Sequence, residues 1–265
     1  MSFIKDYWQE IQNGNIIAGA YIKLELAKLV GEIDNPNLVI DYEASNKRID
    51  FIEKECRHSE APFAGKPFKL MLFQKAIIEA LFAIKVYSAE LKRPIRKYQE
   101  MLLVEGRKGG KTPFAAAISL AEWFCGEQGT KILYGSNDYD QADLLYTATD
   151  NMREASIKLS KCTHRNQKGI YFGNLRKRTR KGKFGYLNKG SIRKISAKGK
   201  NKEGRNIKIG IVDEIHEMED NKLIMPIRQA LSTQQEPLYI EITTEGFTED
   251  GYLDERLTAA KKPLS

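Results

Sequence analysis

The segment that most constrains the fold of this chain is MLLVEGRKGGKTPFAAA, which begins at Met101. An apolar strand, Met101–Glu105, leads into a glycine-rich turn, Gly106–Gly110, and an alanine-rich helix over Thr112–Trp123 follows. This order points several backbone N–H groups and a helix N-terminus at one spot, which suits a polyphosphate. The segment therefore predicts a phosphate-binding loop, with an ordinary strand–turn–helix and chance glycines as the alternative.

Two side chains at the end of this loop have the chemistry that a nucleoside triphosphate needs. We expect Lys111 to reach the β- and γ-phosphates of ATP, and the hydroxyl of Thr112 to bind Mg²⁺. The spacing departs from the usual pattern, because Glu105 stands where the first glycine would be and Gly106 is displaced by one residue. The predicted nucleotide-binding residues in the loop itself are Gly106, Arg107, Lys108, Gly109 and Gly110.

A second motif, IKIGIVDEIHEM, places acidic residues after the apolar strand Ile207–Val212. An acid at the carboxyl end of a parallel strand lies where ligands bind in open α/β sheets. We expect Asp213 to hold Mg²⁺ through water, and Glu214 to activate the water that attacks ATP. A solvated acidic turn is the alternative interpretation. His216, two residues further on, either contacts this site or is a surface histidine.

Three more residues are predicted to contact the nucleotide. Thr243 and Thr244 close the apolar strand Leu238–Thr243, where their hydroxyls would sense the γ-phosphate, although threonine ends many strands. Gln74 precedes the phosphate loop, and its amide can pair with N6 and N7 of adenine. A surface position on a helix is the alternative for Gln74.

Strands and helices alternate after residue 100, which predicts an α/β fold with a mostly parallel sheet covered by helices on both faces. The other expected strands and helices are Lys131–Gly135, Asp140–Arg153, Ile170–Phe172, Ser191–Ser196 and Leu223–Leu231.

The region before residue 100 has a different texture. Residues 1–60 show helical periodicity, and Phe68–Val86 is expected to form a short entry and an amphipathic helix. Pro62 and Gly65 break the chain between them. We therefore expect an N-terminal helical extension, residues 1–62, and a P-loop ATPase domain, residues 63–265.

Charge and composition narrow the class of protein. The net charge is +8, and bases are densest in the run Arg176–Lys183, which is either a solvated loop or a contact to nucleic-acid phosphates. No apolar segment approaches the roughly 20 residues that a membrane span needs, and the N-terminus lacks a signal-peptide layout. The three cysteines are widely spaced, which suits a reducing cytoplasm and gives no metal-binding pattern.

The order of these segments resembles the large terminase subunit of tailed bacteriophages, the motor that packages viral DNA. PFAGKPFKLMLFQKAIIEALF is similar to the family's adenine-recognition segment, and Arg107 stands at the arginine that terminases carry inside their phosphate loop. ILYGSNDYDQADLLYTATDNM, with Gln141 and Ala142, resembles the strand and helix that follow, and EITTEGFTEDG resembles the coupling motif. The resemblance covers almost the whole chain.

This resemblance implies a P-loop ATPase of the additional-strand, catalytic-glutamate type, which uses ATP and Mg²⁺ to drive double-stranded DNA into a procapsid. The implied partners are DNA, the portal protein, the small terminase subunit and sister subunits in a homo-oligomeric ring, with a monomer as the alternative for the isolated chain. The implied location is the cytoplasm of the infected or lysogenic bacterial host. The family's C-terminal nuclease domain has no room before Ser265, so no nuclease activity is expected.

A ring ATPase usually borrows a cation from its neighbour to neutralise charge in the transition state. Arg205 is the first candidate for this catalytic role. The equally weighted alternative is that Arg205 is a basic residue on the surface without such a role. Arg107 could do the same within the subunit.

Two other function classes share part of this pattern. A helicase or another nucleic-acid-stimulated ATPase would also carry an Asp-Glu pair, but it needs a second RecA-like domain for which 265 residues leave no space. A non-hydrolysing DNA-binding module would not need Lys111, Thr112, Asp213 and Glu214 together. A nucleotide titration with and without Mg²⁺ separates that module from the ATPases.

Overall fold

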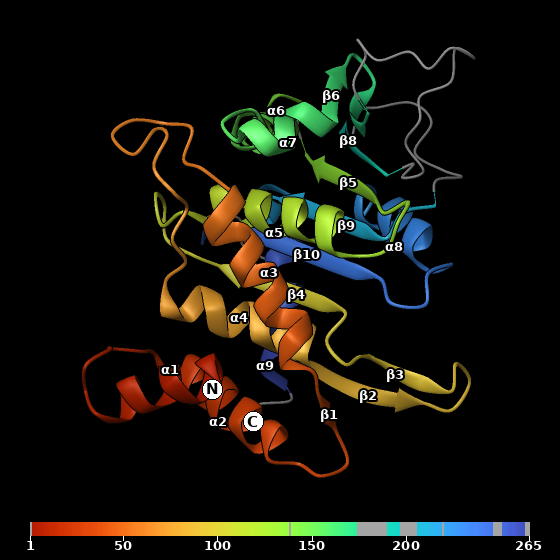
Figure 1. Cartoon of the computed structure of the whole chain (residues 1–265). Coiled ribbons are helices and arrows are strands. Elements are labelled where there is room, and N and C mark those ends of the chain that lie inside the picture. Colours follow the sequence, from red (N-terminus) through yellow and green to blue (C-terminus); the bar gives the residue numbers. More distant parts are fainter. Residues whose placement is uncertain are drawn as a thin grey trace.

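The computed structural model describes residues 2–137, 139–173, 190–196, 206–218, 220–245 and 251–262. Within these residues a seven-stranded sheet with the order β4-β10-β9-β5-β8-β7-β6 forms the centre of the molecule (Figure 1). Its strands are β4 (Glu100–Val104), β5 (Lys131–Ser136), β6 (Thr163–Asn166), β7 (Gly169–Phe172), β8 (Ser191–Ser196), β9 (Ile209–Asp213) and β10 (Leu238–Thr243).

The part of the sheet that carries the predicted motifs is parallel. β4, β10, β9, β5 and β8 all run in one direction, and β7 and β6 extend the sheet with antiparallel pairing. β9 and β10 are buried along their whole length, as expected for strands covered on both faces. β10 lies between β4 and β9 as the additional strand. The predicted α/β fold with a mostly parallel sheet is therefore confirmed.

Helices pack on both faces of the sheet. α5 (Lys111–Cys125) and α6 (Tyr139–Glu154) cover one face, and α8 (Ile224–Leu231) and α9 (Tyr252–Lys261) contribute to the core on the other. The short helix α7 (Ile157–Cys162) leads into β6.

Small residues set how closely these helices approach the sheet. On α5, Ala115, Ala116 and Ala117 are fully buried. On β9, a Cβ added to Gly210 would lie 2.5 Å from Cγ2 of Ile227, which belongs to α8. The glycine inside the IKIGIV motif therefore gives α8 room to pack directly on the strand that ends at the acidic pair.

Residues before the sheet form a helical layer and a small second sheet. The helices are α1 (Phe3–Gln12), α2 (Ala20–Ile33), α3 (Tyr42–Glu55) and α4 (Leu72–Ala83), and the strands are β1 (Val39–Ile40), β2 (Ile84–Ser88) and β3 (Arg93–Arg96). The expected helical N-terminal region is confirmed. The expected extension of the helix to Val86 is wrong, because α4 ends at Ala83 and the next residues pair with β1 and β3. β-Branched and aromatic residues favour that extended conformation.

The N-terminal helices are joined to the sheet by packing and by buried charge. α3 contacts both α4 and α5, and Ile52 and Cys56 belong to the main core. Arg48 of α3 and Arg96 of β3 both bind Glu122 of α5, with N–O distances of 2.6 and 3.2 Å. Residues on both sides of the expected domain boundary therefore share one core.

No helix in the described part of the chain is long and apolar enough to cross a membrane. The basic run Arg176–Lys183 lies outside the described residues.

Candidate active site

The predicted site residues lie at the edge of the sheet where the parallel strands end. Residues of β10 pair with β4 up to Thr243 opposite Val104, and with β9 up to Ile242 opposite Asp213. The loop after β4 and the acidic pair after β9 therefore leave the sheet at the same edge, on either side of β10. This edge is where open α/β sheets bind their ligands.

The loop between β4 and α5 adopts a compact turn. The N–H of Gly109 donates to the carbonyl oxygen of Gly106 at 3.0 Å, and Lys108 has a positive φ of 64°. Gly110 is the N-cap of α5 with a φ of 102°, a conformation that residues with a Cβ adopt at a cost. Successive turns of this kind gather N–H groups that suit an anion, and the N-terminus of α5 adds its dipole.

Lys111 connects this loop to the acidic motif. It is the first residue of α5, and its Nζ lies 3.0 Å from Oε1 of Glu214. The Lys111 and Glu214 side chains are 11% and 24% exposed, so the pair is shielded from solvent. The structure therefore brings together two residues that the sequence places about a hundred positions apart.

The acidic pair has an unusual backbone and an unusual charge balance. Glu214 adopts a left-handed conformation, with φ 54° and ψ 50°, which is uncommon for a residue other than glycine. Its N–H lies 2.9 Å from the carbonyl oxygen of Ile242 and 2.8 Å from Oδ1 of Asp213. Burial, and then the charge of Glu214, raises the pKa of Asp213 to about 7, while the charge of Lys111 opposes this change.

Thr243 and Thr244 are both buried at the end of β10. The hydroxyl of Thr243 donates to the carbonyl oxygen of Thr244 at 2.9 Å, and it also lies 2.9 Å from Nδ1 of His216. His216 belongs to η1 (Ile215–Glu217), and its side chain is only 13% exposed. The surface alternative for His216 is therefore wrong, and the histidine joins β10 to the acidic motif.

The remaining predicted residues are placed differently. Gln74 is buried at the start of α4, where its Oε1 accepts the N–H of Met71 at 3.0 Å. In the described part of the chain, no hydrogen bond joins its amide to the phosphate loop. Arg107 and Lys108 are exposed on the loop, and Arg205 lies outside the described residues.

Glu105 has a position that sequence reasoning noted but did not interpret. A Cβ added to Gly109 would lie 2.6 Å from Oε1 of Glu105, so this side chain lies against the phosphate loop. Its Oε2 is buried and has no hydrogen-bond partner in the described part of the chain. Burial raises the pKa of Glu105, and the charge of Lys111 acts in the opposite direction. A carboxylate here opposes the negative charge of a phosphate.

Sequence reasoning missed a second set of polar contacts at the same edge of the sheet. Ser136, the last residue of β5 and the register partner of Asp213, donates to Oε1 of Gln141 at 2.9 Å. Nε2 of Gln141 donates to Oε2 of Glu217 at 2.6 Å. Two features of the sequence could have indicated these contacts. They are the position of Ser136 at a strand end and the family resemblance around Gln141.

The two residues that are predicted to hold Mg²⁺ lie at the edge of the sheet where the parallel strands end. Thr112 lies in the first turn of α5, directly after Lys111, and Asp213 ends β9. No group of three His, Cys, Asp or Glu residues within the described ranges could hold a metal ion. Mg²⁺ usually binds through one or two protein oxygens together with water and substrate phosphates, so the donor set fits this ion.

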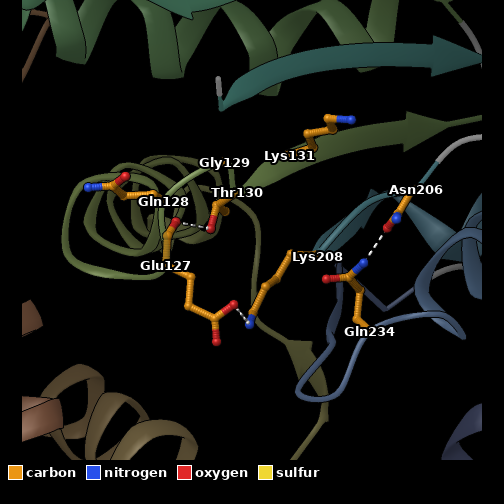
Figure 2. A pocket seen from close by; sticks show the side chains of 8 residues that line it. All are labelled: Glu127, Gln128, Gly129, Thr130, Lys131, Asn206, Lys208 and Gln234. Carbon is orange, nitrogen blue, oxygen red and sulfur yellow. Dashed lines mark hydrogen bonds and ion pairs between the residues drawn. The ribbon is translucent and has the colours of Figure 1, made fainter. Parts of the chain in front are cut away.

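A separate polar pocket of about 210 Å³ lies among Glu127, Thr130, Lys208 and Gln234 (Figure 2). It is lined by residues that precede β5 and β9, including Thr130 and Lys208. Nζ of Lys208 is 2.8 Å from Oε2 of Glu127, so its charge is already paired. Because this pocket lies at the amino ends of the strands, it is distinct from the predicted nucleotide site.

Comparison with known proteins agrees with this geometry. The family model described as terminase large subunit, ATPase domain, matches residues 72–262. The large terminase subunit of Enterobacteria phage HK97 is 27% identical over 201 residues, which are 74% of this chain and 36% of that protein. The crystal structure of the HK97 large terminase has the same fold, with a TM-score of 0.63 and 24% identity over 83% of this chain and 42% of that one.

The chain therefore spans little more than a third of the curated relative that it matches, 36% of its length. The family model covers the phosphate loop, the acidic motif and β10. This match favours neither the hypothesis of a helicase-like ATPase nor that of a non-hydrolysing DNA-binding module. The chain belongs to the terminase large subunit family and contains its nucleotide-binding ATPase domain.

Proposed function

We propose that this chain hydrolyses ATP with Mg²⁺ and thereby drives double-stranded DNA into a viral procapsid. The observation that carries the proposal is the 3.0 Å contact between Lys111 and Glu214. In this contact, the lysine that would bind phosphate and the carboxylate that would activate water lie side by side, mostly shielded from solvent. The match to the ATPase domain family supports the same chemistry.

The side chains would act in a defined order. The N–H groups of the loop Gly106–Gly110 and the charge of Lys111 would bind the triphosphate. Lys111 would then leave Glu214 for the β- and γ-phosphates, and the released carboxylate would accept a proton from the attacking water. Thr112 and Asp213 would hold Mg²⁺, which neutralises charge on the phosphate oxygens.

We also propose an adenine contact for Gln74 and a γ-phosphate-sensing role for Thr243 and Thr244. Gln74 would need to exchange its hydrogen bond with Met71 for one with the base. Thr243 and Thr244 would respond to the γ-phosphate from the end of β10, next to the loop and the acidic pair.

Membership of the terminase large subunit family supports a proposal about assembly. Subunits would form a homo-oligomeric ring on the portal protein, with the small terminase subunit as a further partner, in the cytoplasm of the bacterial host. Arg205 of a neighbouring subunit would complete the site, with Arg107 of the same subunit as the alternative. Residues 1–62 would form a helical extension of the ATPase domain.

The test separates binding from chemistry with three variants. Glu214→Gln should bind ATP as the wild type does but lose turnover by about 100-fold or more, because an amide cannot accept the proton. Asp213→Ala should lose Mg²⁺-dependent binding instead. Glu60→Gln, the same chemical change at an exposed position, is the control and should alter neither. If Glu214→Gln and Asp213→Ala behaved alike, the assignment of their roles would be wrong.

A further inference from the structure

His216 lies between the end of β10 and the carboxylate of Glu214, and the proposed mechanism gives it no role. Its backbone N–H donates to Oγ1 of Thr243 at 3.2 Å, and its Nδ1 lies 2.9 Å from the same oxygen. Nδ1 also lies 3.1 Å from Oε2 of Glu214. One ring nitrogen is therefore within reach of both the strand end and the carboxylate that would activate water.

The hydrogen bonds of Thr243 favour a proton on Nδ1 of the His216 ring. A threonine hydroxyl has a single proton, and Thr243 donates it to the carbonyl oxygen of Thr244. With this assignment, the ring donates the contact between Nδ1 of His216 and Oγ1 of Thr243. This makes Nδ1 a donor that Thr243 and Glu214 can share.

The carboxylate of Glu214 is only partly satisfied. Its Oε1 contacts Lys111, whereas its Oε2 is buried and accepts no hydrogen bond from any residue that the structure describes. A buried acceptor without a donor is costly. Nδ1–H of His216 is close enough to satisfy it, and a small rotation of the ring away from Thr243 would align the two atoms.

We propose that His216 is a positioning residue that holds Glu214 in the orientation needed to activate water, an inference that rests on the proposed ATP hydrolysis. When Lys111 turns to the phosphates, Nδ1–H passes from Thr243 to Oε2 and becomes the fixed partner of the carboxylate. The left-handed backbone of Glu214 already restricts where its side chain points.

This arrangement also connects β10 to the chemistry. Thr243 and Glu214 compete for one proton, so a displacement of the strand end changes how firmly His216 holds the carboxylate. The ring would then have two discrete arrangements that both sites can bias, which is what coupling between sites requires.

The kinetic test uses two substitutions of the same side chain in the whole chain. His216→Phe keeps a ring and removes its nitrogens, whereas His216→Asn keeps an N–H near the place of Nδ1. We expect His216→Phe to lower kcat about tenfold or more with nearly unchanged ATP affinity, and His216→Asn to recover most of that loss. Equal kcat values for wild type and His216→Phe, or equal losses in both variants, would overturn the proposal.

A double substitution shows whether His216 acts through Glu214. Adding His216→Phe to Glu214→Gln should cause no further loss of turnover, because the group that His216 positions is already gone. A further loss of about tenfold would mean that His216 has an independent role and would overturn the proposal. Thermal melts of each variant separate these effects from unfolding.

A spectroscopic test needs no turnover, because the chain has only three histidines and their ring nitrogen signals can be resolved by NMR. Thr243→Val and Glu214→Gln should each shift the Nδ1 signal of His216 and leave those of His58 and His164 in place. An unmoved His216 signal in both variants overturns the proposed contact.

By contrast, a wild-type chain without ATP hydrolysis, or full turnover in Glu214→Gln, contradicts the proposed function itself.

Discussion

Nζ of Lys111 lies 3.0 Å from Oε1 of Glu214, so the lysine that is predicted to meet phosphates is paired with the carboxylate that is predicted to activate water. A triphosphate that binds here must compete with Glu214 for Lys111. Phosphate binding would then release the carboxylate, and this release would link occupancy of the site to its chemistry.

This pairing makes the charge of Lys111 the first feature to test. Lys111→Met keeps the buried stem but removes the charge, so we expect ATP affinity to fall about tenfold or more and turnover to be lost. Lys111→Arg restores a charge of different shape and should bind ATP better than the methionine variant. Fluorescent-nucleotide titration and phosphate release measure the two effects. Unchanged turnover in Lys111→Met would exclude the phosphate-loop assignment.

Glu105 should weaken nucleotide binding, because its carboxylate lies against Gly109 in the loop and near Lys111. Glu105→Gln removes that charge and keeps the shape, so we expect ATP to bind about threefold tighter or more. Glu105→Asp keeps the charge and serves as the control, with no gain expected. Nucleotide titrations at low and high salt provide the measurement. Weaker binding to Glu105→Gln would instead mean that the carboxylate supports the loop.

The pKa of Asp213, raised to about 7 by burial and then by the charge of Glu214, predicts a pH-dependent stability. The folded chain holds this proton more tightly than the unfolded chain. The contribution of Asp213 is therefore complete below its unfolded pKa of about 4 and is lost as the pH rises toward about 7.

Asp213→Asn cannot ionise, so its free energy of unfolding should equal that of the wild type near pH 4 and exceed it above pH about 7. Between these values the difference should grow by at most about 1.4 kcal/mol for each pH unit. Urea unfolding in EDTA across this range measures the difference. In a Glu214→Gln background this difference in stability should be smaller, because the charge of Glu214 is one cause of the raised pKa of Asp213. Parallel pH profiles for Asp213→Asn and wild type would contradict the raised pKa.

Arg205 is predicted to complete the site of a neighbouring subunit. The rate per subunit should then rise with protein concentration, and Arg205→Ala should remove that rise without changing nucleotide binding. Mixing Arg205→Ala with Glu214→Gln should restore some activity, because one interface then holds an intact Glu214 and an intact Arg205. No recovery in a mixture shown to co-assemble would assign the role elsewhere. A flat rate across assembly states would favour Arg107 within the subunit.

Glu122 is predicted to be essential for stability, because it is buried between Arg48 and Arg96. Glu122→Gln leaves two buried cations without their counter-charge and should lower the free energy of unfolding by about 3 kcal/mol. The exposed pair of Asp50 and Lys54 on α3 is the matched control, and Asp50→Asn should cost less than about 0.5 kcal/mol. Denaturant unfolding of both variants checks the contrast.

The elements that carry the site were predictable because each has a strong local signal. Each signal lies within a few neighbouring residues. The signals are the apolar runs of β9 and β10, the glycine-rich turn before Lys111 and the alanine-rich start of α5. Their alternation also implied a parallel sheet, whose strand ends must share an edge. The strand β2 was missed because the apolar run that ends α4 continues into it without a break.

The amino-acid sequence thus predicted the phosphate loop, the acidic strand and the parallel sheet that brings them to one edge. The folded chain was needed to show that β10 lies between β4 and β9, and that Thr243 contacts His216, 27 positions away. It alone showed that Glu241, inside the apolar run of β10, is fully buried and bound by Tyr239, Tyr252 and Arg256. Such contacts depend on strand order, on register and on the donors that other elements bring to a buried acceptor. None of these leaves a signal within the few residues over which periodicity can be read.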